Sequence, residues 1–187
     1  MKRSLGPSPL LFPSPAIVIC SYDKEGRANA MTAAWSGISC SDPPCVSISL
    51  RKETYTYWNI METKAFTVNI PSEEMVRSVD SFAMTSGRKA DKLRNAGMTP
   101  IRSEVVNAPF IDEFPMALEC QAVQFIELGM HTMFVGEIKD VKVSEETIGR
   151  SGEGLMMDIR PLVYSHDDHS YYSVGKKVAN VGVSIGR

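Results

Sequence analysis

Residues 116–143, MALECQAVQFIELGMHTMFVGEIKDVKV, contain two long strand-like segments separated by a single turn. Residues 116–128 and 131–143 each combine apolar and β-branched side chains with interspersed polar ones. Gly129 stands between them, where a tight turn needs a residue that tolerates positive φ. We therefore predict two long strands joined by a tight turn, within a fold that is mainly β.

Shorter segments on both sides of this pair carry the same kind of signal. Residues 16–22 are rich in β-branched side chains, and residues 45–50 alternate between apolar and polar side chains. The predicted strands before the long pair are 16–22, 29–35, 45–50 and 65–70. Two short strands are predicted after it, at 162–164 and 171–174.

Helices are predicted between the strands. Residues 54–64 show helical spacing, with Thr54 as the expected N-cap, and Ser72 is expected to cap a second helix. Strands joined by short turns, with helices inserted, favour a closed or nearly closed barrel over a doubly wound parallel sheet. No repeat or linker is evident, so we predict that residues 1–187 form a single domain.

Composition narrows the class of protein. Apolar residues make up 43% and charged residues 22%, and the net charge is −2, which gives no sign of a nucleic-acid partner. No apolar run approaches the roughly 20 residues of a membrane span. Four prolines between residues 7 and 15 interrupt what would be a signal peptide, so we expect a cytoplasmic protein.

The four cysteines do not predict a metal site. None forms a C-x-x-C pair, and no histidine flanks them, so no metal is expected. Cys20 and Cys120 lie in apolar runs and are expected to be buried, inert thiols. Cys40 and Cys45 flank Ser-Asp-Pro-Pro; a redox pair there is the less favoured alternative to a rigid loop.

Three polar clusters are candidate binding sites. In residues 29–35, NAMTAAW, small side chains leave the backbone open to a flat polar ring, although spacing alone favours tight strand packing as the explanation. Residues 49–55, SLRKETY, combine two cations with a helix start, which suits a phosphate as well as a solvated loop. Residues 86–92, SGRKADK, form a second anion-binding candidate or a charged surface.

Other motifs are weak or missing. His131 lies beside the predicted turn, where a surface or structural role is common, and His166-Asp-Asp-His169 is expected to be a solvated turn. The chain has no G-x-x-x-x-G-K-[ST], G-x-G-x-x-G or G-x-S-x-G motif, so these nucleotide and hydrolase classes lack support.

Taken in order, the clusters resemble the flavin-reductase-like family, and more narrowly its flavoredoxin branch. The resemblance runs from about Phe12 to about Lys176. It is carried by NAMT leading to Trp35, by SDPP at 41–44, by SLRK with Thr54-Tyr55, by FTVNIP at 66–71, and by SGRK with Asp91-Lys92. Gly129, His131, Gly136 and the tail with Pro161-Leu162 and Tyr171-Tyr172 complete it.

The resemblance implies an FMN-binding split β-barrel that forms a homodimer. It implies that the isoalloxazine edge of FMN is bound, largely through backbone, by Asn29, Ala30, Met31, Thr32 and Ala33, with Trp35 close by. The ribityl phosphate is assigned to Ser49, Leu50, Arg51, Lys52, Thr54 and Tyr55, and its cover to Ser86, Arg88, Lys89 and Lys92. His131 is the candidate catalytic residue, where some members approach the nicotinamide or flavin.

The implied function is an oxidoreductase that takes electrons onto FMN from NAD(P)H or a redox protein. It would pass them to free flavin, ferric iron or another protein. The alternative is a flavoredoxin-type electron carrier with no nicotinamide activity of its own. A barrel that has lost its flavin is a third hypothesis.

Overall fold

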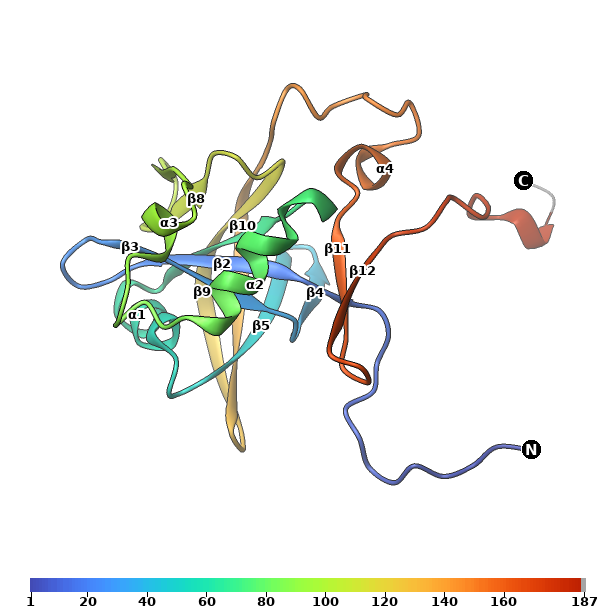
Figure 1. Cartoon of the computed structure of the whole chain (residues 1–187), viewed down its shortest axis with the longest axis horizontal. Coiled ribbons are helices and arrows are strands. Elements are labelled where there is room, and N and C mark those ends of the chain that lie inside the picture. Colours follow the sequence, from blue (N-terminus) through green and yellow to red (C-terminus); the bar gives the residue numbers. More distant parts are fainter. Residues whose placement is uncertain (186–187) are drawn as a thin grey trace.

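The computed structural model describes residues 1–185, and its central feature is one antiparallel sheet of seven strands (Figure 1). Each neighbouring pair in the order β3-β2-β6-β9-β10-β5-β4 is antiparallel. The strands are β2 (Ile17–Tyr22), β3 (Ala28–Ala33), β4 (Ser36–Ser41), β5 (Pro44–Arg51), β6 (Ala65–Ile70), β9 (Met116–Leu128) and β10 (His131–Val143).

The sheet curls around a single core and stays open at one seam. The core cluster takes side chains from both ends of the strand order, including Ile17 and Ala33 with Val46 and Ile48. The end strands β3 and β4 have no ladder between them in residues 1–185. The fold is therefore a split barrel, and the prediction of a mainly β, barrel-like chain is confirmed.

The predicted long hairpin is confirmed as β9 and β10. Its turn has Gly129 at φ 59°, and the ladder shifts register between Val135 and Gly136. A Cβ on Gly136 would lie 2.5 Å from the Phe66 ring, so only glycine allows Phe66 to fill the core at this bulge.

Three of the inserted helices pack against β2 and β3, whereas the fourth lies apart from the sheet in the C-terminal part of the chain (Figure 1). They are α1 (Tyr55–Thr63), α2 (Val76–Met84), α3 (Lys92–Asn95) and α4 (Leu155–Ile159), with short 3₁₀ turns at Glu73–Met75 and Val183–Ile185. A second core cluster joins α2 and α3 to the sheet, with Val79 and Phe82 of α2 fully buried against Val18 and Ala30.

Two helix-start predictions need correction. Thr54 holds the N-cap position of α1, but its hydroxyl donates to the Arg51 carbonyl at 2.8 Å and leaves the first turn uncapped. Ser72 precedes the 3₁₀ turn and not α2, which begins at Val76. At Thr54 a local turn competes with the helix for the side chain, whereas Ser72 makes no side-chain cap hydrogen bond.

Two small sheets complete the described strands. They comprise β1 (Ser14–Pro15) with β11 (Leu162–Ser165) and β12 (Ser170–Ser173), and β7 (Pro100–Arg102) with β8 (Pro109–Ile111). The predicted strand over residues 29–35 is too long, because the chain turns at Ala34-Trp35 and continues as β4. β4 was not predicted, because its side chains are small, polar and exposed.

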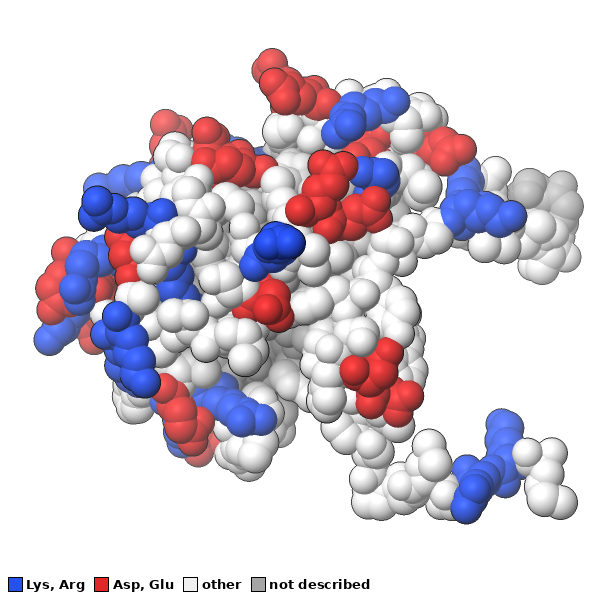
Figure 2. Space-filling view, in the orientation of Figure 1, with Lys and Arg blue, Asp and Glu red and all other residues white. Residues whose placement is uncertain are grey.

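Charge is mixed over the visible face of the molecule, where acidic and basic side chains alternate (Figure 2). Within residues 1–185, no helix is both long and apolar enough to span a membrane.

Candidate functional site

The first part of the site is the outer edge of β3. This strand pairs with β2 on one side and ends the strand order, so its other edge has no strand partner in the described chain. An edge strand presents unpaired backbone donors and acceptors. Met31, Thr32 and Ala33 line a cavity of about 660 Å³ beside this edge, which we call the edge-strand pocket.

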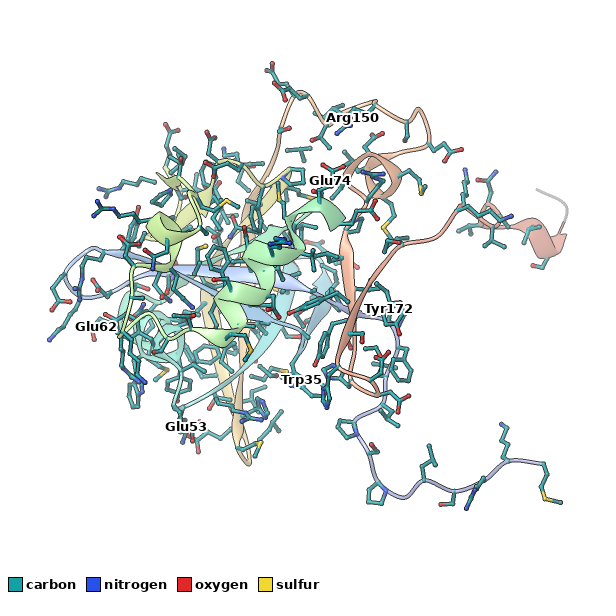
Figure 3. All side chains as sticks on the ribbon, in the orientation of Figure 1. Trp35, Glu53, Glu62, Glu74, Arg150 and Tyr172 are labelled. Atoms are coloured by element: carbon teal, nitrogen blue, oxygen red, sulfur yellow. The ribbon has the colours of Figure 1, made fainter. Side chains whose placement is uncertain are left out.

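Aromatic rings also line the edge-strand pocket. Trp35 stacks on His166 with ring centroids 4.2 Å apart, and His131 meets Trp35 edge-on at 6.2 Å. Trp35 lies between the barrel and the β11–β12 hairpin (Figure 3). The pocket thus pairs a polar backbone edge with stacked aromatic surfaces, a combination that suits a flat conjugated ring.

The β11–β12 turn contributes residues that the sequence analysis missed. Residues 166–169 form the expected turn, in which all residues but His166 are exposed. The sequence did not indicate that His166 and His169 line the edge-strand pocket together with Tyr164 and Tyr171. The Tyr164 hydroxyl lies 3.0 Å from His169 Nδ1, and the Tyr171 hydroxyl donates to Asp80 of α2 at 3.3 Å. The Nε2 atom of His166 is buried without a hydrogen-bond partner among the described residues.

A second cavity, of about 420 Å³, adjoins the first at the N-terminus of α1; we call it the helix pocket. Met31, Arg51 and Thr54 line both pockets. The helix pocket also includes Tyr55 and Thr56 of the uncapped first turn. Free backbone N–H groups at a helix start favour a bound anion.

The cations of the helix pocket are Arg51 and Lys92, and its one carboxylate is Glu53. Lys92 is only 5% exposed, and its Nζ donates to the Phe82 carbonyl at 3.0 Å. None of the ion pairs within residues 1–185 includes Lys92. Burial lowers the pKa of Lys92 to about 8, although nearby Cys20 opposes the change.

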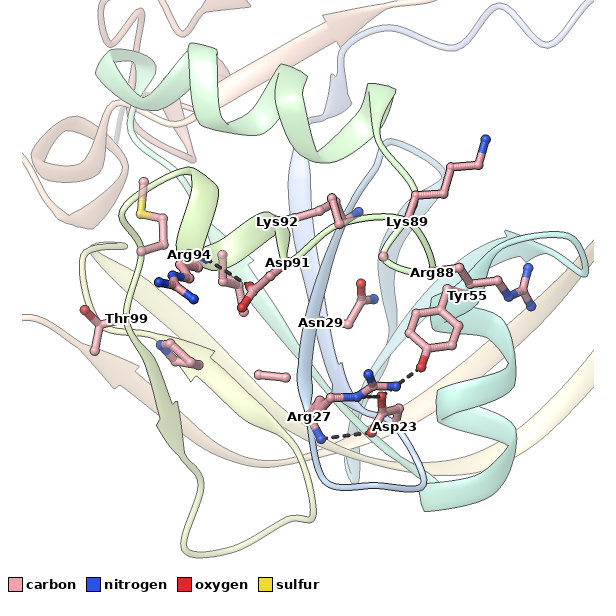
Figure 4. Close-up of a pocket in the computed structure, with 16 residues that line it drawn as sticks. Asp23, Arg27, Asn29, Tyr55, Arg88, Lys89, Asp91, Lys92, Arg94 and Thr99 are labelled. Atoms are coloured by element: carbon pink, nitrogen blue, oxygen red, sulfur yellow. Dashed lines mark hydrogen bonds and ion pairs between the residues drawn. The ribbon is translucent and has the colours of Figure 1, made fainter.

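A hydrogen-bond network lines an outer cavity that shares Asn29 and Tyr55 with the helix pocket (Figure 4). The Asp23 carboxylate accepts from Arg27 Nε and from the Tyr55 hydroxyl, each at 2.8 Å. Burial alone would raise the pKa of Asp23, but these hydrogen bonds and the Arg27 backbone N–H lower it overall. Asn29 is held in turn, since its Nδ2 donates to Thr56 Oγ1 at 2.8 Å.

The loop of residues 85–91 lies over this network. A Cβ on Gly87 would lie 1.9 Å from Asn29 Oδ1 and 3.0 Å from the Tyr55 ring, so glycine is required for this approach. Ser86 lines the helix pocket. Arg88 donates a hydrogen bond to the Glu53 carbonyl at 2.9 Å. Arg88 and Lys89 line the outer cavity, and their side chains extend away from Asp23 (Figure 4).

The structure brings together most of the predicted site residues. The predicted residues that line the edge-strand or helix pocket are Asn29, Met31, Thr32, Ala33, Trp35, Ser49, Leu50, Arg51, Thr54, Tyr55, Ser86, Lys92 and His131. The side chain of Ala30 is buried against α2 and lines neither pocket. Lys52 forms an ion pair with Glu127 at 2.7 Å outside both. The Thr32 hydroxyl donates to the Val79 carbonyl, which leaves its backbone for the predicted ring contact.

The pKa of His131 is shifted by burial and by charged neighbours. His131 pairs with Arg51 in the β5–β10 register. Burial and the adjacent Arg51 lower the pKa of His131, while Glu53 has the opposite effect. His131 is therefore held neutral at neutral pH, when one ring nitrogen can donate and the other can accept.

Comparison with known proteins assigns the family. Residues 10–173 match the model of the flavin reductase like domain, so the chain belongs to this family. Flavoredoxin of Desulfovibrio vulgaris (Miyazaki F) is 43% identical, with a TM-score of 0.90 and 97% of both chains covered. Flavoredoxin from Methanosarcina acetivorans is 29% identical, with a TM-score of 0.89 and 99% of both chains covered.

A curated relative, an uncharacterized protein of Aeropyrum pernix, is 31% identical over 156 residues, or 83% of this chain. The match spans only 58% of that relative's length. The resemblance to the flavin-reductase-like family and its flavoredoxin branch is confirmed.

Proposed function

We propose that this chain binds FMN across the two joined pockets and is an oxidoreductase that works through the bound flavin. The observation that carries the proposal is Lys92, a buried cation that lines the same pocket as the uncapped first turn of α1 and has no carboxylate partner among the described residues. A buried charge is costly unless an opposite charge compensates it. A phosphate in the helix pocket supplies that charge.

The remaining residues of the helix pocket fit the same group. Arg51 can make a bidentate contact with a phosphate, and the first-turn N–H groups of α1 and the Ser86 hydroxyl add neutral donors. One end of the combined cavity is therefore cationic and the other is flat and aromatic. A ligand with a phosphate at one end and a flat ring at the other, such as FMN, fits this cavity better than a flavin without phosphate or a small inorganic anion.

The edge-strand pocket would orient the ring. The free edge of β3 offers alternating N–H and C=O groups to the polar rim of an isoalloxazine, and Trp35 bounds its face or edge. When bound, FMN supplies the electron chemistry, accepting and passing on electrons. The chain would bind, orient and shield the flavin. Neutral His131, which lines the edge-strand pocket, can donate a hydrogen bond from one ring nitrogen and accept one at the other.

The electron donor separates two versions of the function. We favour an enzyme that is reduced by NAD(P)H and passes electrons to free flavin, ferric iron or a redox protein, with His131 beside the donor. The position of His131 in the lining of the edge-strand pocket, where the ring would bind, supports this version. The alternative, an electron carrier reduced only by a protein partner, is supported by the likeness to two flavoredoxins.

Anaerobic reduction followed by absorbance distinguishes the two versions. The purified protein, loaded with FMN, is mixed with NADH and then with NADPH. Prompt loss of the flavin bands is expected for the nicotinamide-dependent enzyme. Bands that persist until dithionite is added would contradict that enzyme and favour the carrier, and protein that takes up no flavin would contradict both.

A homodimer in the cytoplasm completes the proposal. Exposed apolar side chains on the outer half of the β9–β10 hairpin, Leu128 and Met130 among them, support a second copy as partner. The four free cysteines agree with a reducing compartment. Light scattering is expected to give twice the mass of one chain, and the mass of one chain would contradict the dimer.

A further inference from the structure

Cys40 and Cys45 stand directly opposite each other in the β4–β5 ladder. They flank the Ser41–Pro44 pair that closes the hairpin, and both are free thiols. Residues opposite each other in an antiparallel pair have Cα atoms about 4.5–5.5 Å apart, with side chains on the same face. This spacing lies within the range of about 4.4–6.8 Å that a disulfide spans.

We propose that Cys40 and Cys45 form a redox-active pair that closes reversibly to a disulfide across the hairpin. The proposal is independent of FMN binding, because neither cysteine lines the edge-strand or helix pocket. The cysteine pair lies where β4, the strand that follows Trp35 in the chain, ends and β5 begins.

The two thiols have different surroundings, which sets the order of events. Cys40 is exposed, and its thiol donates only to the Asp42 carbonyl, with Sγ and O 3.3 Å apart. Cys45 is 7% exposed. Burial raises the pKa of the Cys45 thiol, and Cys40 and Glu137 add to this effect while Lys139 opposes it. Cys40 therefore reacts first, and Cys45 resolves.

The oxidant is a low-molecular-weight disulfide. The Cys40 thiolate attacks one sulfur of the oxidant, so that a mixed disulfide forms and one small thiol leaves. The Cys45 thiolate then attacks Cys40 Sγ, which forms the Cys40–Cys45 bond and releases the second small thiol. The two cysteines lose two protons and two electrons, and the oxidant gains them.

The other two cysteines cannot take part. Cys20 and Cys120 are at most 1% exposed, and burial raises the pKa of each thiol to about 12. They lie on β2 and β9, away from the hairpin tip in the chain. The expectation that these two thiols are buried is confirmed, whereas the less favoured redox alternative for Cys40 and Cys45 now has a structural basis.

The experiment treats the native, FMN-loaded protein with oxidised glutathione, blocks free thiols and digests the chain with trypsin. Residues 28–51 form one tryptic peptide that contains Cys40 and Cys45 and no other cysteine. We expect this peptide to become lighter by two hydrogen atoms and to regain them with dithiothreitol. Flavin absorbance is recorded in parallel, so that loss of the cofactor is seen separately.

Matched variants test the order of attack. Cys45→Ser should leave the peptide of residues 28–51 with one glutathione on Cys40, and Cys120→Ser should still form the internal disulfide. A lasting glutathione adduct in the unsubstituted protein, a disulfide between two chains, or an unchanged peptide would each overturn the proposal.

Discussion

At the scale of single residues, Lys92 is the buried cation that points to an anionic ligand. Its ammonium group is buried on the first residue of α3, with a backbone carbonyl as its acceptor. Such a group destabilises the empty protein, and under the proposed function a bound phosphate offsets this cost. The sequence motif SGRKADK predicts a cation here, but neither its burial nor its lack of a carboxylate partner.

The pH dependence of stability tests this burial. Because the pKa of Lys92 falls from its ordinary 10.5 to about 8, the unfolded chain binds more protons than the folded chain between these values. The free energy of unfolding of the flavin-free protein should therefore rise with pH from about 8 to 10.5. The slope from this group is at most about 1.4 kcal/mol per pH unit.

Urea unfolding of wild type and Lys92→Met across this range measures the effect. The variant should be the more stable protein near pH 7, and its advantage should vanish toward pH 10.5. Lys52→Met, which removes an exposed lysine paired with Glu127, is the control and should keep the wild-type rise. Parallel profiles for wild type and Lys92→Met would show that Lys92 is not a buried cation.

At the scale of elements, the site depends on the close approach of the loop of residues 85–91 to β3 and α1. Gly87 allows this approach, because any side chain there would displace Asn29 from its hydrogen bond with Thr56. Gly87→Ala should lower the free energy of unfolding by about 1–3 kcal/mol and weaken FMN binding.

Gly37→Ala is the matched control for that variant. Gly37 lies on the exposed strand β4, and nothing stands within 4 Å of the Cβ that alanine would add. Thermal unfolding and flavin titration of both variants give the comparison. Equal effects at Gly37 and Gly87, or none at Gly87, would contradict the tight approach to Asn29.

The sequence predicts those elements in which apolar side chains recur in a regular pattern or form a continuous run. β2, β5, β6 and the β9–β10 hairpin were predicted because apolar residues face the core in alternation or in runs. β4 was missed because an exposed edge strand has no buried face to generate a pattern. The helix starts were misjudged because Thr54 and Ser72 serve local turns, which spacing does not reveal.

At the scale of the whole molecule, the site is assembled from segments far apart in the chain. Trp35, His131 and His166 come from the β3–β4 connection, β10 and the C-terminal hairpin, yet they meet in one pocket. The first two were predicted from a family resemblance. His166 was not, because only the path of the β11–β12 hairpin places it over Trp35.

The same scale explains why the structure separates Lys52 from Arg51, which the sequence analysis grouped together. The two are adjacent in sequence, but β5 ends at Arg51 and the chain turns, so Lys52 reaches Glu127 on β9. Of these two neighbouring cations, Arg51 therefore lines both pockets and Lys52 lines neither. This difference provides a control for the phosphate assignment.

The most direct test of the account is a titration of FMN and riboflavin, which differ only by the phosphate, into four proteins: wild type, Arg51→Met, Lys92→Met and Lys52→Met. Arg51→Met and Lys92→Met should each weaken FMN by about 1.5–3 kcal/mol and leave riboflavin nearly unchanged, because each removes a charge-assisted contact. Lys52→Met should alter neither ligand. Equal losses for FMN and riboflavin, or a loss for Lys52→Met as large as for Lys92→Met, would place the phosphate elsewhere and contradict the account.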